Sequence, residues 1–84
     1  MGYKVVLLSG AQRDFATLPT KEHDRIASAL RLLGEYATTS QNIKKLALPL
    51  VGYRKRVGVY RILFDIAGDT IAVHRIKHRK DAYR

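Results

Sequence analysis

Apolar residues crowd the start of the chain, where Val and Leu fill most of Tyr3–Leu8. This composition favours an extended strand, so we expect a strand over Tyr3–Leu8. Ser9 follows, with Gln12 three residues later, which is the pattern of a capping box at the start of a helix. We therefore expect a short helix after Ser9 that ends before Pro19. Its apolar side would be formed by Ala11, Phe15 and Leu18.

A second amphipathic pattern covers Lys21–Tyr36, with Thr20 before it as a candidate N-cap. Apolar residues recur there at three- and four-residue spacing, which places them on one stripe of a helix. The opposite side carries charged residues and is expected to face solvent. Two short helices in succession predict a helical hairpin that packs on a sheet. The buried stripe is expected to contain Ile26, Ala29, Leu30 and Leu33.

Residues 37–52 show no clean periodicity, so we interpret them as a connection that is attached to the core by three leucines, Leu46, Leu48 and Leu50. Alternation of apolar and polar residues then predicts three strands. Gly58 permits a reversal after the first, and Ala67–Thr70 has the composition of a hairpin turn. The tail, Lys77–Arg84, is too polar for the core. The three expected strands are Tyr53–Val57, Tyr60–Ile66 and Ile71–Ile76.

The element order β-α-α-β-β-β predicts an α+β fold with a single domain over residues 1–84. The three late strands should form an antiparallel meander, and the first strand should join the same sheet to bury its apolar side. We expect the helical hairpin to pack on one face of this small, mainly antiparallel sheet. The other face of the sheet is then left partly open to solvent.

Side-chain alternation assigns three arginines to this open face. Arg54 and Arg56 share one face of their strand. In the next strand, Arg61 is on the face that does not carry Ile62 and Phe64. If Ile62 and Phe64 pack under the helices, Arg61 points outward beside the other two arginines. Each guanidinium group is planar and permanently charged, which suits a phosphate group. Three solvated arginines on an ordinary antiparallel sheet are the alternative interpretation.

Charge favours the phosphate interpretation. The 84 residues carry 16 Lys and Arg against seven Asp and Glu, a formal net charge of +9. Most of the excess lies late in the chain, because residues 53–84 hold nine basic and three acidic side chains. So basic a small protein indicates a polyanionic partner, above all a nucleic acid. An anionic membrane surface or an acidic protein stays open at this point.

Several other classes of site lack support in the sequence. The chain has no cysteine, which excludes disulfides and thiolate metal sites. His74 and His78 are four residues apart, but in a strand end and tail this spacing does not bring the two rings together. No P-loop or dinucleotide fingerprint occurs, and no apolar run is long enough to span a bilayer. We therefore expect no metal, no cofactor and no membrane partner.

The side chains that remain fit one reaction, RNA transphosphorylation, in which the RNA's own 2′-hydroxyl is the nucleophile. The protein must then deprotonate that hydroxyl, offset charge on the phosphate oxygens and support the leaving 5′-oxygen. Arginines suit the second task. Tyr83 and His78 are the candidates for proton transfer. The alternatives are that Tyr83 packs the tail onto the sheet and that His78 is a hydrogen-bonding surface residue.

Two segments resemble the RelE toxins of the RelE/ParE superfamily, which are small basic proteins of toxin–antitoxin pairs. They are the run Tyr53–Phe64, YRKRVGVYRILF, and the ending His78–Arg84, HRKDAYR. The resemblance implies a RelE-like fold and a metal-independent, ribosome-dependent mRNA endonuclease, or mRNA interferase. Such an enzyme inhibits translation by cutting the codon displayed in the ribosomal A site.

The resemblance also implies roles for individual residues. Arg61 matches the arginine that steadies the phosphate, Arg79 the one assigned to the leaving group, and Tyr83 the proposed general base. The catalytic set that it implies is Arg54, Arg56, Arg61, Arg79, Tyr83 and His78. Further contacts to RNA are expected from Lys55, Arg75, Lys77 and Lys80.

The partners that the family implies are a cognate RelB-like antitoxin in a hetero-oligomer, and the ribosomal A site with its mRNA and rRNA. The expected location is the cytoplasm. One alternative is a ParE-like toxin of the same fold that binds and poisons DNA gyrase without nuclease activity. Another is a plain binding module without a reaction of its own. The intact set of arginines with the tail tyrosine favours the nuclease.

Overall fold

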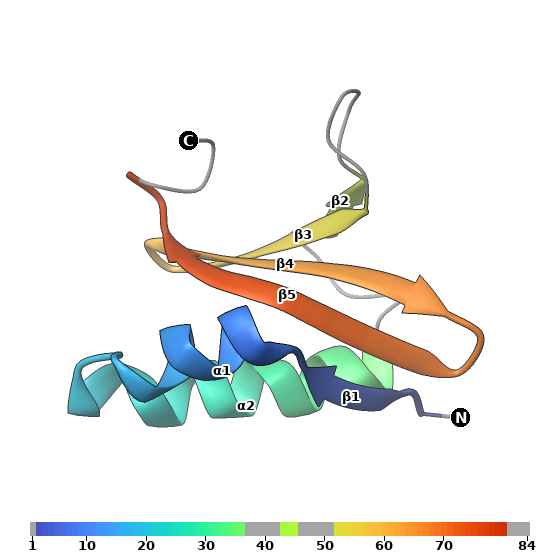
Figure 1. Ribbon diagram of the computed structural model, residues 1–84, viewed down its shortest axis with the longest axis horizontal. Coiled ribbons are helices and arrows are strands. Elements are labelled where there is room, and N and C mark those ends of the chain that lie inside the picture. Colours follow the sequence, from blue (N-terminus) through green and yellow to red (C-terminus); the bar gives the residue numbers. More distant parts are fainter. Residues whose placement is uncertain (1, 37–42, 46–51, 81–84) are drawn as a thin grey trace.

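The computed structural model describes residues 2–36, 43–45 and 52–80 of the chain. These residues form a five-stranded sheet with two helices on one of its faces (Figure 1). The elements in chain order are β1 (Lys4–Leu7), α1 (Ser9–Ala16), α2 (Thr20–Tyr36), β2 (Ile43–Lys45), β3 (Tyr53–Val57), β4 (Tyr60–Ala67) and β5 (Thr70–His78). The expected α+β fold, with a helical hairpin under a mainly antiparallel sheet, is confirmed.

The strands lie in the order β1-β5-β4-β3-β2. β1 joins β5 in parallel, with Val5 opposite Ile71, and the other neighbours are all antiparallel. The connection between these two parallel strands runs through both helices and then through β2, β3 and β4. Both turns of the meander begin at a glycine in the left-handed region, because Gly58 and Gly68 have φ angles of +60° and +61°.

The core lies between the helices and the covered face of the sheet. Ile26 and Leu33 of α2 are fully buried, as are Ile62 of β4 and Ile71 of β5, and Phe64 is 1% exposed. Burial of each such side chain contributes about 1.5–3 kcal/mol, so this apolar layer is the main source of stability. Alternation along the strands then leaves the charged side chains for the opposite, uncovered face.

One part of the expected connection is a strand. Ile43–Lys45 pairs antiparallel with Tyr53–Lys55 and forms β2 at the edge of the sheet. The expectation of a plain connection over residues 37–52 was wrong here, because three residues are too few to show an alternating pattern. The rest of that segment, with Leu46, Leu48 and Leu50, lies outside the described residues.

The expected capping box of α1 is absent. Leu8 occupies the N-cap position and gives no side-chain hydrogen bond to the helix. Gln12 instead donates from Nε2 to the Leu7 carbonyl at 2.8 Å, which satisfies a group at the end of β1. At the short connection between β1 and α1, the Gln12 side chain therefore binds the end of the strand and does not cap the helix. The second helix begins at Thr20, one residue before the expected start.

β5 is longer than expected, since it continues two residues past Ile76 to His78. The additional residues are held by β4, where Tyr60 pairs with His78 and Arg61 with Lys77. Lys77 and His78 therefore lie in the sheet, and the expectation that they belong to a tail was wrong. Their polarity hid the strand, because this end of the sheet lies at the surface.

Candidate functional site

The uncovered face of the sheet gathers basic side chains from three neighbouring strands. Arg56 of β3 lies opposite Arg61 of β4, and Arg61 lies opposite Lys77 of β5. Opposed residues in antiparallel strands share a face, and Arg54 shares that face because it is two residues from Arg56. Buried Ile62 points the other way, toward the helices. The expected placement of the three arginines on the open face is therefore what the structure shows.

We call Arg54, Arg56, Arg61 and Arg79 the arginine cluster. Desolvation lowers the pKa of Arg61, and the charges of Arg54, Arg56 and Arg79 lower it further. The cluster is therefore close enough for its members to repel one another. An arginine stays charged at any ordinary pH, so an anion bound among these side chains would reduce their repulsion.

Arg61 lies at the centre of the cluster and is only partly exposed. Its Nε and Nη1 atoms are shielded from solvent, and no residue in the described part of the chain accepts a hydrogen bond from them. A buried donor without an acceptor costs about 1–3 kcal/mol, and more when the group is charged. Two N–H groups of one guanidinium form a fork that matches two oxygens of a phosphate.

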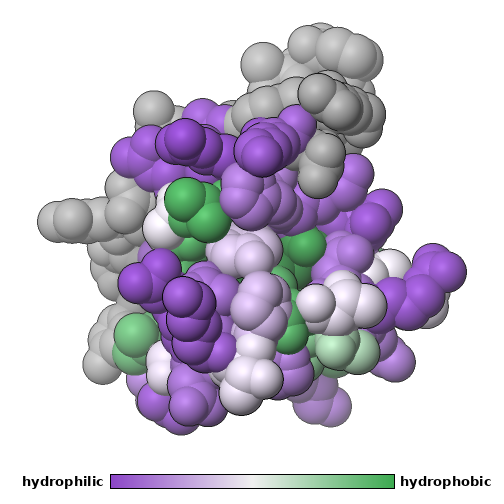
Figure 2. Space-filling view, turned by 90° about the vertical axis from the view of Figure 1, so that its left-hand side faces the viewer, coloured by the Kyte–Doolittle hydropathy of each residue, from purple (hydrophilic) through white to green (hydrophobic). Residues whose placement is uncertain are grey.

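Arg79 reaches the cluster through the turn that follows β5. Its backbone N–H donates to the Val59 carbonyl at 2.6 Å, which fastens this turn to the β3–β4 turn. Figure 2 shows the end of the molecule where β3 turns into β4, and hydrophilic side chains cover most of its described surface. The sequence thus brings residues from two turns and three strands to one end of the sheet.

His78 lies on the other side of the sheet from the arginine cluster. It is opposite Tyr60, whose side chain is on the covered face and is 9% exposed. The two rings meet edge to face with centroids 5.6 Å apart. The Nδ1 atom of His78 accepts a hydrogen bond from the Lys80 backbone N–H at 3.2 Å. The ring is therefore engaged on two sides.

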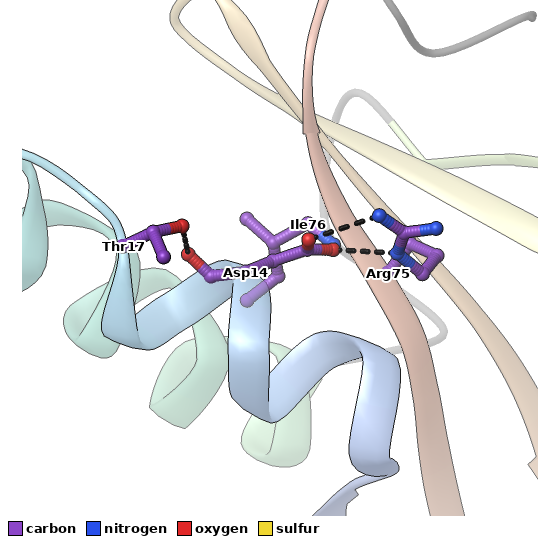
Figure 3. Close-up of polar contacts among 4 residues, drawn as sticks. All are labelled: Asp14, Thr17, Arg75 and Ile76. Atoms are coloured by element: carbon purple, nitrogen blue, oxygen red, sulfur yellow. Dashed lines mark hydrogen bonds and ion pairs between the residues drawn. The ribbon is translucent and has the colours of Figure 1, made fainter.

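Arg75 points away from the cluster. It donates from Nε and Nη2 to the two carboxylate oxygens of Asp14 on α1, at 2.7 and 3.0 Å (Figure 3). The same carboxylate accepts the Ile76 backbone N–H at 2.8 Å. We call this group of contacts the Asp14 clamp. An RNA contact from Arg75 would have to compete with it.

Desolvation of the Asp14 carboxyl raises its pKa, but the other contributions outweigh this. The hydrogen bonds from Arg75 and Ile76, with the charges of Arg75 and Lys77, hold the pKa of Asp14 below its usual value. The hydrogen bond with Asp14 in turn raises the pKa of Arg75. No local pattern indicates this pair, because Asp14 and Arg75 are 61 residues apart.

A bulge in the sheet explains why Arg75 and its neighbour point to different partners. The pairing of β4 with β5 shifts between Leu63 and Phe64, so His74 and Arg75 are both exposed. His74 meets Asp65 of β4, with Nε2 2.5 Å from Oδ2. No sequence pattern predicts this pair either, since the bulge that creates it leaves no local signature.

The remaining candidates are distributed as follows. Lys77 shares the face of Arg61, whereas Lys55 lies opposite Ile62 and so shares the covered face. Lys80 is exposed in the turn after β5. Tyr83 lies outside the described residues. Within the described ranges, no group of three or more His, Asp or Glu side chains could hold a metal ion. None of the helices there is long and apolar enough to cross a membrane.

These features define a class: a small α+β protein whose uncovered sheet face presents an arginine cluster suited to an oxyanion. No family model matches the chain. Among curated proteins, Toxin RelE3 of Methanocaldococcus jannaschii is 35% identical over an alignment of 65 residues, and the match covers 69% of this chain and 74% of RelE3.

Solved structures of toxin–antitoxin complexes also match this chain. The toxin–antitoxin complex RelBE2 from Mycobacterium tuberculosis contains a chain that matches with a TM-score of 0.84 and 26% identity, over 94% of this chain and 100% of that one. The RelB–RelE antitoxin–toxin complex from Methanococcus jannaschii matches with a TM-score of 0.73 and 28% identity, over 93% and 94%. The chain belongs to the RelE toxins of the RelE/ParE superfamily. It is thus a toxin of a toxin–antitoxin system.

Proposed function

We propose that this toxin is an mRNA interferase: a metal-independent endoribonuclease that cuts mRNA in the ribosomal A site and so stops translation. The observation that carries the proposal is the central position of Arg61. Its Nε and Nη1 atoms have no acceptor among the described residues, and three further arginines lie close enough to lower its pKa. A phosphodiester would supply both the acceptors and the negative charge.

The reaction that fits this arrangement uses the RNA's own 2′-hydroxyl as the nucleophile. The 2′-hydroxyl loses its proton to a base, its oxygen bonds to phosphorus, and the bond from phosphorus to the 5′-oxygen breaks. The 5′-oxygen then takes a proton from a water molecule, and the base returns its proton to the hydroxide that is left. The products are a 2′,3′-cyclic phosphate and a 5′-hydroxyl, so atoms and charge balance.

The arginine cluster would act on the phosphate and on the leaving group. Negative charge builds up on the nonbridging oxygens in the transition state, where the fork of Arg61 and the charges of Arg54 and Arg56 oppose it. Arg79 would stabilise the leaving 5′-oxygen. Its guanidinium N–H groups would support that oxygen by hydrogen bonding. The tail residue Tyr83 is the proposed base.

We also propose a RelB-like antitoxin as the partner of this chain, in a toxin–antitoxin hetero-oligomer. Both solved structures reported above as similar to this chain are toxin–antitoxin complexes. A face that holds four arginines needs an acidic counterpart to neutralise it when no RNA is bound. In action the toxin would meet the ribosome, its mRNA and its rRNA, which places it in the cytoplasm.

The test is primer extension on mRNA bound to ribosomes, with the purified toxin. We expect cuts within the A-site codon, none in mRNA without ribosomes, and a cyclic phosphate at the new 3′ end. An mRNA with a single 2′-deoxy nucleotide at the cut position should resist, because it lacks the nucleophile. Uncut mRNA together with inhibited gyrase supercoiling would replace the proposal by the ParE-like alternative.

A further inference from the structure

His78 is the one candidate for proton transfer that the described residues contain, and its surroundings assign it a different task. The register places it with Tyr60 on the covered face, whereas Arg61 and Lys77 lie on the open face. The sheet backbone therefore separates the His78 ring from the arginine cluster. A base for the 2′-hydroxyl would have to lie on the side where the phosphate binds.

The hydrogen bond to the ring also fixes where its proton lies. The donor is the Lys80 backbone N–H, which always carries its hydrogen, so Nδ1 of His78 must offer a lone pair. In a neutral imidazole the single proton then sits on Nε2. A ring in this state has one nitrogen occupied by Lys80 and the other already protonated, so neither can take a proton from RNA.

The same hydrogen bond shapes the turn that carries Arg79. A side-chain acceptor that binds the backbone N–H two residues later is the arrangement of an Asx turn, which Asn and Asp usually form. Nδ1 of histidine and Oδ1 of asparagine are both two bonds from Cβ. The turn is held a second time by the bond from the Arg79 N–H to the Val59 carbonyl.

We infer that His78 is a positioning residue: its neutral ring, packed on Tyr60, binds the Lys80 N–H through Nδ1 and thereby fixes the turn that delivers Arg79 to the arginine cluster. This inference deepens the proposed function and rests on it for the effect on cleavage. The state of the ring itself is independent of any activity.

The first arm of the test is NMR on the free toxin. A long-range ¹H–¹⁵N spectrum of the histidine rings, taken where the rings are neutral, should show His78 with its proton on Nε2. A cross-peak pattern with the proton on Nδ1 would overturn the inference. This measurement requires no RNA, so it stands whether or not the protein cleaves mRNA.

The second arm compares His78→Asn, His78→Gln and His78→Ala in single-turnover cleavage on ribosomes. Loss of one net hydrogen bond corresponds to a roughly tenfold change in rate. His78→Asn keeps an acceptor for the Lys80 N–H, so this variant should cleave within about threefold of the parent rate. Alanine removes the acceptor and glutamine displaces it, so both should lose roughly tenfold. The matched control is His74→Asn in the same strand, which should leave the rate within about twofold.

The outcomes separate the two proposals. None of the three substitutes can accept a proton, so a base at His78 predicts equal losses of about 100-fold or more for all of them, which would overturn the inference. Three variants as fast as the parent would overturn it as well. A parent toxin that does not cut mRNA would refute the proposed function, while the NMR arm would still decide the state of the ring.

Discussion

Asp14 joins two elements through a single carboxylate. β1 ends at Leu7, so no strand in the described part of the chain flanks β5 on that side beyond Val73, and the Ile76 N–H needs another acceptor. Asp14 of α1 accepts that N–H and both N–H groups offered by Arg75. A carboxylate with three donors is favoured strongly in its ionised form. The clamp therefore holds α1 against the half of β5 that leads to the cluster.

Replacement of Asp14 by Asn should lower the free energy of unfolding by about 1–3 kcal/mol at neutral pH, because hydrogen bonds to a charged acceptor are lost. The effect should depend on pH with a definite sign. The folded state holds the Asp14 pKa below its unfolded value, so the stabilisation is complete above about pH 4 and disappears as the pH falls through the lowered pKa. Urea unfolding of parent and variant at several pH values measures this.

The matched control is Asp24→Asn, which removes the same charge from an exposed position on α2. Its unfolding free energy should differ little from that of the parent. If the loss in Asp14→Asn did not shrink as the pH falls below about 4, the ionised clamp would not be its cause.

Helix α1 lies against β5 at a distance that only a small residue allows. A Cβ on Gly10 would come within 2.8 Å of Arg75 Cδ and 3.0 Å of the His74 carbonyl oxygen. The first contact involves a side chain that the Asp14 clamp already holds, and the second involves backbone. Neither neighbour can give way cheaply, so Gly10 sets the spacing between the helix and the sheet.

Gly10→Ala tests this spacing. Alanine favours a helix over glycine by about 1 kcal/mol, whereas overpacking costs about 1–3 kcal/mol. We expect the second effect to win, so thermal unfolding should show a lower Tm for the variant. Arg13→Ala on the exposed side of the same helix provides the control and should change Tm little. A higher Tm in Gly10→Ala would show that α1 can move away from β5 at no cost.

Local patterns predicted most of the elements. The alternation of Tyr60, Ile62 and Phe64 gave the covered face of β4 and, with it, the outward direction of Arg61, since both follow from a two-residue period. The stripe of α2 was equally local. Features that depend on residues far apart were missed: β2 forms because β3 offers an edge, and the clamp links Asp14 to Arg75 across 61 positions.

In the candidate site, too, some features follow from local sequence patterns and others depend on residues far apart in the chain. Its strand arginines were placed correctly from alternation, while the partner of Arg75 and the side on which His78 lies depend on the bulge and on the full length of β5. Tyr83 stays a prediction from the sequence and the family resemblance, because it lies outside the described residues.

The molecule as a whole carries a net charge of +9, and the fold concentrates much of it at one end of the sheet. Association with the ribosome should therefore release counterions and weaken with salt. Four arginines that engage phosphates predict a slope of roughly −3 in a plot of log K against log salt concentration. Sedimentation binding to ribosomes over a range of KCl concentrations measures this slope. An affinity that does not change with salt would contradict electrostatic docking through the cluster.

The central claim is that Arg61 binds the scissile phosphate, and the single-turnover cleavage rate of Arg61→Ala on mRNA-programmed ribosomes tests it most directly. The control is Arg13→Ala, which removes an equal charge from the exposed side of α1. Loss of a donor that stabilises transition-state charge should slow Arg61→Ala by about 100- to 1,000-fold, with the fold unchanged by circular dichroism, while Arg13→Ala stays within about twofold of the parent. Equal rates in the two variants would contradict the account.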